Sequence, residues 1–278
     1  MINFILKYKF PFFVLVIAIL LIGTSFLLKL EKEREQRIIY ERILAEQKAL
    51  KERERRAELK LYLMGKFEPS QKEGFVSVPD AYSISGYKMY LRKETLDAFL
   101  KMAEKAKEEN IDLKIASATR NFAYQKNLWN NKWTGYTLVE NKDLSKSIPD
   151  GLKRFEKILE YSAAPSTSRH HWGSDIDINN ANKEYFETKT GEKVYEWLEK
   201  NASAFGFCQP YNQKRNTRTT GYNEEKWHWS YAPLAKTFTQ EYKNLIQETE
   251  INGFMGDENV SKLNLINDYV LGINPECI

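Results

Sequence analysis

Histidine and aspartate residues cluster in the stretch 167–177, which reads T-S-R-H-H-W-G-S-D-I-D. Two of the chain's three histidines, His170 and His171, lie there, and Asp175 and Asp177 follow within a few residues. An imidazole and a carboxylate that converge on one point supply two of the three protein ligands of a hydrolytic zinc site. The stretch is therefore a candidate metal site.

The third histidine lies in a second motif, E-E-K-W-H-W, where Glu225 precedes His228 by three residues. This spacing suits a metal ligand with a neighbouring base that reaches a water molecule beside the ion. Single histidines are nevertheless more often structural or surface residues than ligands, and paired aspartates on a strand are usually solvated. The residue types alone thus leave a metal site and ordinary polar roles both open.

A short strand should position the two aspartates. Residues 175–178 alternate between aspartate and isoleucine, which predicts a half-buried strand. The isoleucines should face a core, and the aspartates should share the opposite, open face. Gly173 lies just before this strand, where the chain can turn sharply. Such a turn could bring His170 beside the aspartates, although alternation alone does not choose between Asp175 and Asp177.

A second segment with chemical potential, Ser117–Gln125, lies where a predicted strand runs into a predicted helix. Residues 111–115 alternate between apolar and polar, which predicts the strand, and residues 121–131 should form the helix. Arg120 lies at the junction, where its planar guanidinium could bind a carboxylate. A surface ion pair is the alternative role for this arginine.

These motifs together resemble the signature of one enzyme family. The pattern Ser168-x-His170-x-x-Gly173-x-x-x-Asp177, followed by Glu225-x-Trp227-His228, resembles that of VanY-type D-alanyl-D-alanine carboxypeptidases, zinc peptidases of bacterial cell-wall metabolism. The segment that contains Arg120 and Gln125 is similar to the S-x-x-R-x-x-x-x-Q segment of the same family. The resemblance covers about residues 89–231.

The resemblance implies a role for each matching residue. The implied ligands of Zn²⁺ are His170, Asp177 and His228, and the implied catalytic base is Glu225. Arg120 should steady anionic groups of the substrate or transition state. Substrate contacts, or support for the residues that make them, are implied for Gln125 and Ser168.

Neighbouring residues are interpreted from the same spacing. It favours Asp177 over Asp175 and Glu225 over Glu224, and it leaves His171 as a supporting or surface residue. The nearby tryptophans should wall the site, with a plain core role as the alternative: Trp172, Trp227 and Trp229.

The sequence departs from the usual family motifs at two places. Family members commonly read Gly-Thr-Ser-Glu-His where this chain has residues 166–170, and Glu-Pro-Trp-His where it has residues 225–228. Neither change removes an implied ligand or the base. Arg169 does place a positive charge beside the site, which leaves the choice of substrate open.

The fold that the resemblance implies is α+β: a small antiparallel sheet flanked by helices, with zinc on its open face. The implied activity is hydrolysis of the terminal D-alanyl-D-alanine bond of peptidoglycan stem peptides. Alternatives are an L,D-carboxypeptidase, an endopeptidase, or a non-catalytic envelope protein that binds wall peptides.

The N-terminal segment predicts a membrane anchor. Residues 11–28 contain no charge and approach the length of about 20 residues that spans a bilayer. Lys7 and Lys9 precede them, which favours a cytoplasmic N-terminus and a single-pass protein whose catalytic domain lies in the periplasm or outside the cell. A cleaved signal peptide is the alternative. Residues 30–64 are rich in charge and predict a helical stalk, with one weak apolar seam through which chains could self-associate.

The predicted organisation is an anchor over 1–29, a stalk over 30–64, a zinc peptidase domain over 65–240 and a C-terminal helix and tail over 241–278. A further amphipathic helix is predicted over Glu94–Glu109. Cys208 and Cys277 could form a disulfide outside the cytoplasm or remain free thiols. The net charge of +4, without a basic block interleaved with aromatic residues, argues against a nucleic-acid partner.

Overall fold

The computed structural model describes residues 2–84, 86–215 and 217–278, with side chains described from residue 12 onward. The chain divides into two compact units, residues 1–57 and 58–278.

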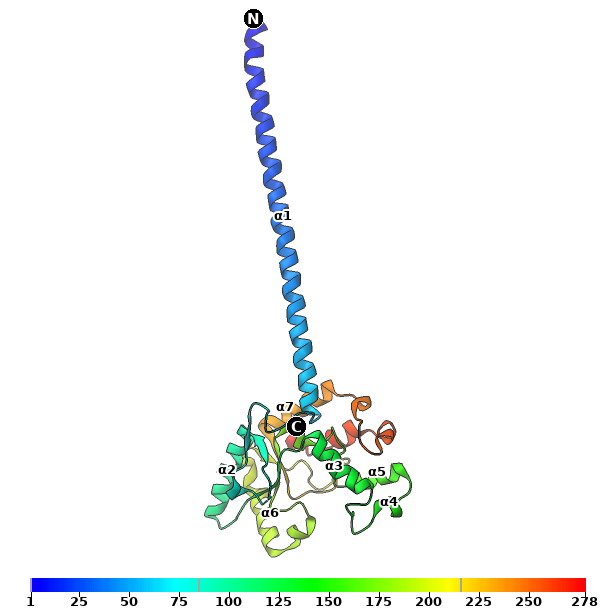
Figure 1. Cartoon of the computed structure of the whole chain (residues 1–278). Helices are drawn as coiled ribbons and strands as arrows, with labels where there is room; N and C mark the ends of the chain where they lie inside the picture. Colours follow the sequence, from blue (N-terminus) through cyan, green and yellow to red (C-terminus); the bar gives the residue numbers. More distant parts are fainter. Residues whose placement is uncertain (1, 85, 216) are drawn as a thin grey trace. The chain divides into compact units, whose positions relative to one another are not determined.

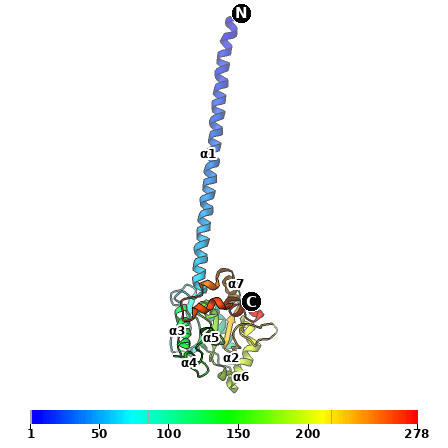
Figure 2. The ribbon, with the colours of Figure 1, turned by 90° about the vertical axis from the view of Figure 1, so that its right-hand side faces the viewer.

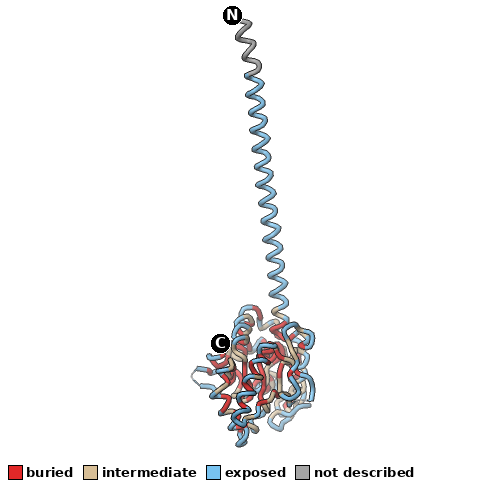
Figure 3. The backbone as a smooth tube through the Cα atoms, turned by 90° about the vertical axis from the view of Figure 1, so that its left-hand side faces the viewer, coloured by how far each residue is buried: buried red, intermediate tan, exposed pale blue. Residues whose placement is uncertain are grey.

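Helix α1 (Ile2–Leu63) runs through the first unit and ends in the second (Figure 1). Both the apolar segment and the charged stalk are therefore helical, as predicted, and the described residues of the first unit are exposed (Figure 3). Among the described residues, α1 is the one helix that is long and apolar enough to cross a membrane, a criterion that a signal sequence also meets. Self-association through the stalk stays a prediction.

Two antiparallel sheets form the framework of the second unit. Strands β1 (Phe75–Ser77) and β2 (Tyr90–Arg92) make a two-stranded sheet. The larger sheet has the order β3-β4-β6-β5, and all of its neighbouring strands are antiparallel. Its strands are β3 (Ile115–Ser117), β4 (Asp175–Ile178), β6 (His228–Tyr231) and β5 (Phe207–Cys208).

In the described part of the second unit, six α-helices flank these sheets: α2 (Lys93–Glu108), α3 (Phe122–Trp133), α4 (Leu144–Ser147), α5 (Gly151–Leu159), α6 (Lys189–Asn201) and α7 (Ala232–Leu245). Short 3-10 and π segments lie between these elements or follow α7: η1 (Asp80–Tyr82), η2 (Arg169–Trp172), η3 (Lys183–Glu187), η4 (Ala202–Phe205), η5 (Glu248–Glu250), η6 (Asp257–Lys262), η7 (Ile266–Val270) and η8 (Pro275–Cys277). The described part of the second unit is thus α+β, as predicted.

The core has two parts, one for each group of helices. The isoleucines of β4 pack with apolar residues of α2 and α6. A second cluster joins α3, α5 and α7 with the residues that follow α7. Figure 1 shows α3 and α5 on one side of the second unit and α2 and α6 on the other, and Figure 2 gives the same elements turned by 90°. Tyr62 and Leu63 at the end of α1, and Met64 just after it, are buried in the second cluster.

Local signals explain several element boundaries. The predicted amphipathic helix is observed as α2, and Asn110 follows it with a positive φ of 61°. At the start of α3, the Asn121 side chain accepts a hydrogen bond from the Tyr124 N–H, as an N-cap residue does. The predicted strand over 111–115 is wrong in extent, because the ladder begins only at Ile115, where pairing with β4 starts.

The C-terminal residues contribute to the fold. Val270, Ile273 and Cys277 are buried in the second cluster, and Cys277 forms a disulfide with Cys208 at the end of β5. Of the two states left open for these cysteines, the structure has the disulfide. The domain boundaries at residues 64 and 240 stay predictions.

Candidate metal centre and active site

The register of the large sheet brings the first two candidate ligands together. Asp177 in β4 lies directly opposite His228 in β6. Residues that face each other in antiparallel strands point to the same side of the sheet, with Cβ atoms about 4.5–5.5 Å apart. Two residues about fifty positions apart in the sequence are therefore neighbours.

A tight turn supplies the third candidate ligand. His170 lies in η2, which Gly173 ends with a left-handed φ of 70°. A Cβ at Gly173 would lie 2.6 Å from the Phe75 ring, so glycine is required for space as well as for conformation. The sharp turn predicted at Gly173 is confirmed, and it directs His170 toward the aspartate face of β4.

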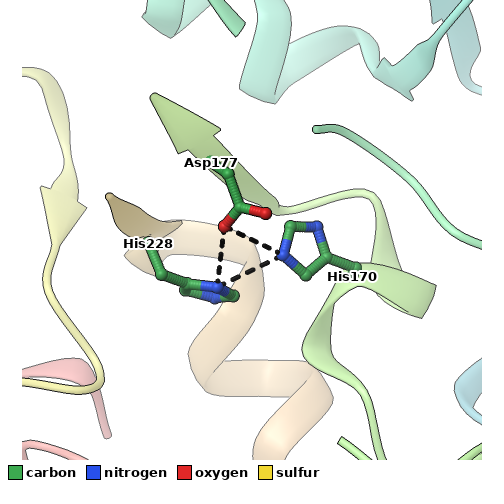
Figure 4. Close-up of side chains that lie close together, drawn as sticks. All are labelled: His170, Asp177 and His228. Carbon is green, nitrogen blue, oxygen red and sulfur yellow. Dashed lines mark hydrogen bonds and ion pairs between the residues drawn. The ribbon is translucent and has the colours of Figure 1, made fainter. Parts of the chain in front are cut away.

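Three ligand atoms form a nearly equilateral triangle (Figure 4). His170 Nε2 lies 3.2 Å from His228 Nδ1. Asp177 Oδ1 lies 3.3 Å from His170 Nε2 and 3.2 Å from His228 Nδ1. Ligands about 2.0–2.1 Å from a tetrahedral zinc ion lie about 3.3–3.4 Å from one another. The three side chains therefore fit zinc without rearrangement, and all three are buried.

The outer hydrogen bonds of both imidazoles direct their lone pairs inward. His170 Nδ1 donates to the Ala118 carbonyl at 2.8 Å, and His228 Nε2 donates to Asp175 Oδ1 at 3.0 Å. Asp177 Oδ1 is buried without a hydrogen-bond donor. Three electron-rich atoms this close together repel one another unless a proton or a metal cation lies among them. This arrangement is typical of a metal site whose ligands are oriented by outer partners.

The pKa shifts also indicate that the space between the three ligand atoms favours a positive charge. Burial alone would lower the pKa of His228, but its contacts with Asp175 and Asp177 raise it to about 9. Burial alone would raise the pKa of Asp177, but His170 and His228 hold it well below its usual range. Burial and the Arg120 charge lower the pKa of His170, which keeps this imidazole neutral.

The orienting partner of His228 is Asp175, which the sequence motif does not single out. Asp175 also accepts from Arg169 Nε at 3.0 Å, and both side chains are fully buried. Arg169 stacks over Trp172 and donates to Thr239 of α7. Arg169 lies beside the site, as expected, but its charge is offset by Asp175. The expected open face is wrong: Asp175 is 0% and Asp177 3% exposed.

The candidate base lies beside the ligands. Glu225 Oε2 is 3.6 Å from His228 Nδ1, and only 6% of the residue is exposed. Burial raises the pKa of Glu225 to about 7, against the opposing pull of His228 and Arg120. A carboxylate with this pKa can both accept and return a proton near neutral pH.

Glu225 lines a small cavity of about 30 Å³, which has room for water. The other residues in its wall are Arg120, Tyr161, Ser162, Ala163, Ser168, His170, Tyr211, Tyr222 and His228. The three tyrosines in this wall were not predicted from the sequence. Trp172, Trp227 and Trp229, which were expected in this wall, belong instead to the two core clusters. They therefore have the plain core role that was the alternative.

Arg120 reaches the candidate metal centre from the segment after β3. Its Nη2 lies 3.9 Å from Asp177 Oδ2, and its Nε is buried without a partner. His171 holds the Arg120 backbone: His171 Nδ1 donates to the Arg120 carbonyl at 2.6 Å, while Nε2 accepts from the Ser166 N–H at 3.2 Å. Burial lowers the pKa of His171 to about 3, so it stays neutral. His171 is therefore a supporting residue and not a surface one.

The two predicted substrate contacts differ in position. Ser168 lies in the cavity wall. Gln125 lies behind the wall, where its Nε2 donates to the Ala163 carbonyl at 2.7 Å. In this structure Gln125 supports a wall segment and does not line the cavity.

Comparisons with known proteins agree with the motifs. A family model described as "VanY: D-alanyl-D-alanine carboxypeptidase" matches residues 88–234. The Bacillus subtilis protein YodJ, named as a carboxypeptidase, is 29% identical over 178 residues, which are 61% of this chain and 56% of YodJ. A D-alanyl-D-alanine carboxypeptidase of Enterococcus faecalis is 33% identical over 90 residues, 32% of each chain. This chain thus spans about half and about a third of the length of these two relatives.

Solved structures are similar as well. The LdcB LD-carboxypeptidase has 25% sequence identity and a TM-score of 0.45, over 66% of this chain and 81% of that one. A vancomycin-resistance D,D-pentapeptidase VanY in complex with Zn(II) has 23% identity and a TM-score of 0.43, over 63% and 94%.

The matched region 88–234 covers more than half of the 278 residues and contains all the residues that form the candidate site. The chain therefore belongs to the VanY D-alanyl-D-alanine carboxypeptidase family.

Proposed function

We propose that this protein is a zinc-dependent D,D-carboxypeptidase that removes the terminal D-alanine from peptidoglycan stem peptides. The observation that carries the proposal is the triangle of His170 Nε2, Asp177 Oδ1 and His228 Nδ1, with Glu225 beside it. Three protein ligands with a base next to them are the parts of a catalytic zinc site.

In this proposal His170, Asp177 and His228 hold the zinc ion. When bound, zinc would lower the pKa of a coordinated water to about 7 and polarise the scissile carbonyl. Glu225 takes a proton from the attacking water on a carboxylate oxygen and then gives it to the leaving amine. Its burial suits both steps, because the raised pKa makes the protonated form accessible near pH 7.

Arg120 stabilises negative charge in the mechanism that we propose. Its guanidinium lies beside Asp177 and lines the cavity with Glu225. Because Arg120 lines the cavity, its guanidinium can donate to a substrate oxygen there. A preorganised donor of this kind acts where charge develops in the transition state.

We further propose that α1 anchors the protein in the cell membrane, with residues 58–278 in the periplasm or outside the cell. The long apolar segment of α1 and the lysines that precede it support this location. Fractionation with membranes, and cleavage by protease added from outside the cytoplasm, would support it. A shortened soluble mature chain would show instead that the segment is removed.

Pentapeptide-bearing muropeptides incubated with the detergent-solubilised full chain would test the activity, with mass spectrometry to identify the residue that is lost. We expect loss of D-alanine that stops on chelation and in Glu225→Gln. Glu224→Gln is the matched control, because Glu224 lies outside the wall of the catalytic cavity.

The same assay separates the alternatives. A cut within the stem would indicate an endopeptidase, and cleavage of tetrapeptides alone would indicate an L,D-carboxypeptidase. Unchanged muropeptides with zinc bound would indicate a binding protein and would contradict the proposed function.

A further inference from the structure

One face of α3 holds a segment of the cavity wall. Gln125 and Lys132 are seven residues apart, or about two helical turns, so they lie on the same side of the helix. Gln125 Nε2 donates to the Ala163 carbonyl, and Lys132 Nζ donates to Ser162 Oγ. Ser162 and Ala163 line the catalytic cavity. Lys132 is therefore one hydrogen bond away from the cavity, although it does not line it.

The hydrogen bond from Lys132 directs the Ser162 hydroxyl. Because Ser162 Oγ accepts from an ammonium group, its own proton must be donated elsewhere. Among the described residues, the Ser162 hydroxyl donates to no protein acceptor. The hydroxyl is therefore a donor in the cavity wall, and the positive charge behind it strengthens it.

Lys132 is also an unusual lysine. It is partly buried, and within the described ranges no carboxylate lies within 4.0 Å of its ammonium group. Burial and the Arg120 charge lower its pKa to about 8, while Glu225 acts in the opposite direction. A partly buried cation without a counter-ion is costly. An anionic ligand would offset that cost.

The charges around the cavity favour such an anion. Arg120 and Lys132 balance Asp177 and Glu225, and Asp175 cancels Arg169. A divalent ion on the three proposed ligands would leave the site with two positive charges in excess. A cavity of one sign of charge attracts ligands of the opposite sign.

We infer that Lys132, acting through the Ser162 hydroxyl, recognises the free terminal carboxylate of the substrate and restricts cleavage to chain ends. This inference rests on the proposed function and adds a specificity-determining pair to it. Ser162 donates the hydrogen bond, and Lys132 holds the serine and supplies the charge.

The test measures peptide binding to the zinc-loaded full chain in detergent, with Glu225→Ala to prevent turnover. The probe is a peptide that ends in D-alanyl-D-alanine, with a free carboxylate or as the C-terminal amide. Lys132→Met keeps the length of the side chain and removes its charge. Lys126→Met is the matched control, because Lys126 is the other lysine of α3.

We expect Lys132→Met to weaken binding of the free-acid peptide roughly 10- to 100-fold, the range for a hydrogen bond between charged groups. Lys126→Met should bind like the parent. The amide should bind weakly, and to the same extent with either residue at position 132. Ser162→Ala should weaken acid binding as well, and the double variant should lose little more than the worse single variant, because the two residues act together.

Three results would overturn the inference. The first is equal acid affinity in Lys132→Met and Lys126→Met. The second is equal weakening of the acid and the amide, which would mean that Lys132 only supports the wall. The third is additive losses in the double variant. If the amide binds too weakly to measure, the acid affinities of Lys132→Met, Ser162→Ala and Lys126→Met decide.

A parallel assay separates this inference from the proposed function, using chains that keep Glu225. If the unmodified protein does not shorten a pentapeptide, the proposed function fails. If the unmodified protein and Lys132→Met shorten it with equal kcat/KM, only the inference fails.

Discussion

The raised pKa of Glu225 has a measurable effect on stability. In the metal-free protein, burial raises this pKa from its ordinary 4.5 to about 7. The fold therefore favours the protonated form, and its contribution to stability is complete below about pH 4.5 and is lost as the pH rises through about 7. Glu225→Gln keeps the shape of the protonated side chain and cannot ionise.

The size of the effect follows from the two pKa values. Each pKa unit corresponds to about 1.36 kcal/mol. The unmodified protein should therefore lose about 3 kcal/mol of unfolding free energy relative to Glu225→Gln between about pH 4.5 and pH 7.5. Groups that titrate alike in both proteins cancel in this difference.

Urea unfolding of the chelator-treated full chain, followed by tryptophan fluorescence, measures this difference. All six tryptophans lie between Trp129 and Trp229, so the signal reports the second unit alone. Added zinc should reduce the pH dependence, because a nearby cation favours the ionised carboxylate. A difference between the two proteins that stays constant with pH would refute the assignment of Glu225 as a buried, desolvated acid.

Further predictions test other parts of the structure. Asp175→Asn should weaken zinc binding about 10- to 100-fold in competition with a chelator, because a neutral amide replaces the carboxylate that orients His228; the exposed Asp97→Asn should not. A chain that begins at Met64 should unfold at least about 2 kcal/mol more easily than one that begins at Glu58, since Tyr62 and Leu63 leave the core; equal urea midpoints would contradict this packing. Replacing both cysteines by serine should cost about 2–4 kcal/mol, because their disulfide closes a loop with a sequence separation of 69; an unchanged midpoint would argue against that bond. The kcat/KM should fall as the pH is lowered and Glu225 becomes protonated. Every active variant that keeps Glu225 should show the same fall on the acid side of its pH profile.

Short-range patterns predicted much of the site. The aspartate–isoleucine alternation indicated β4 and its polar face, and Gly173 indicated the turn that carries His170. These features depend on neighbouring residues and on period-two geometry, which a single sequence displays. The family motif then selected Asp177 over Asp175, which alternation could not do.

The burial of the site could not be predicted from these short-range patterns. Alternation shows which side chains share a face, but not what covers that face. Here α7 places Thr239 against Arg169, and residues after α7 add to the core beside it. The role of Asp175 depends on His228, which lies 53 residues later, and no local pattern links the two. Long-range packing of this kind also decides the position of Lys132.

In the mechanism that we propose, three side chains bind one zinc ion. Metal analysis of the purified full chain, after dialysis against zinc and then metal-free buffer, tests it most directly. We expect one zinc ion per chain in the unmodified protein and in His171→Asn, and none in His170→Ala, Asp177→Ala or His228→Ala. A folded unmodified protein without bound zinc, or equal zinc content in the three ligand variants, would contradict the claim.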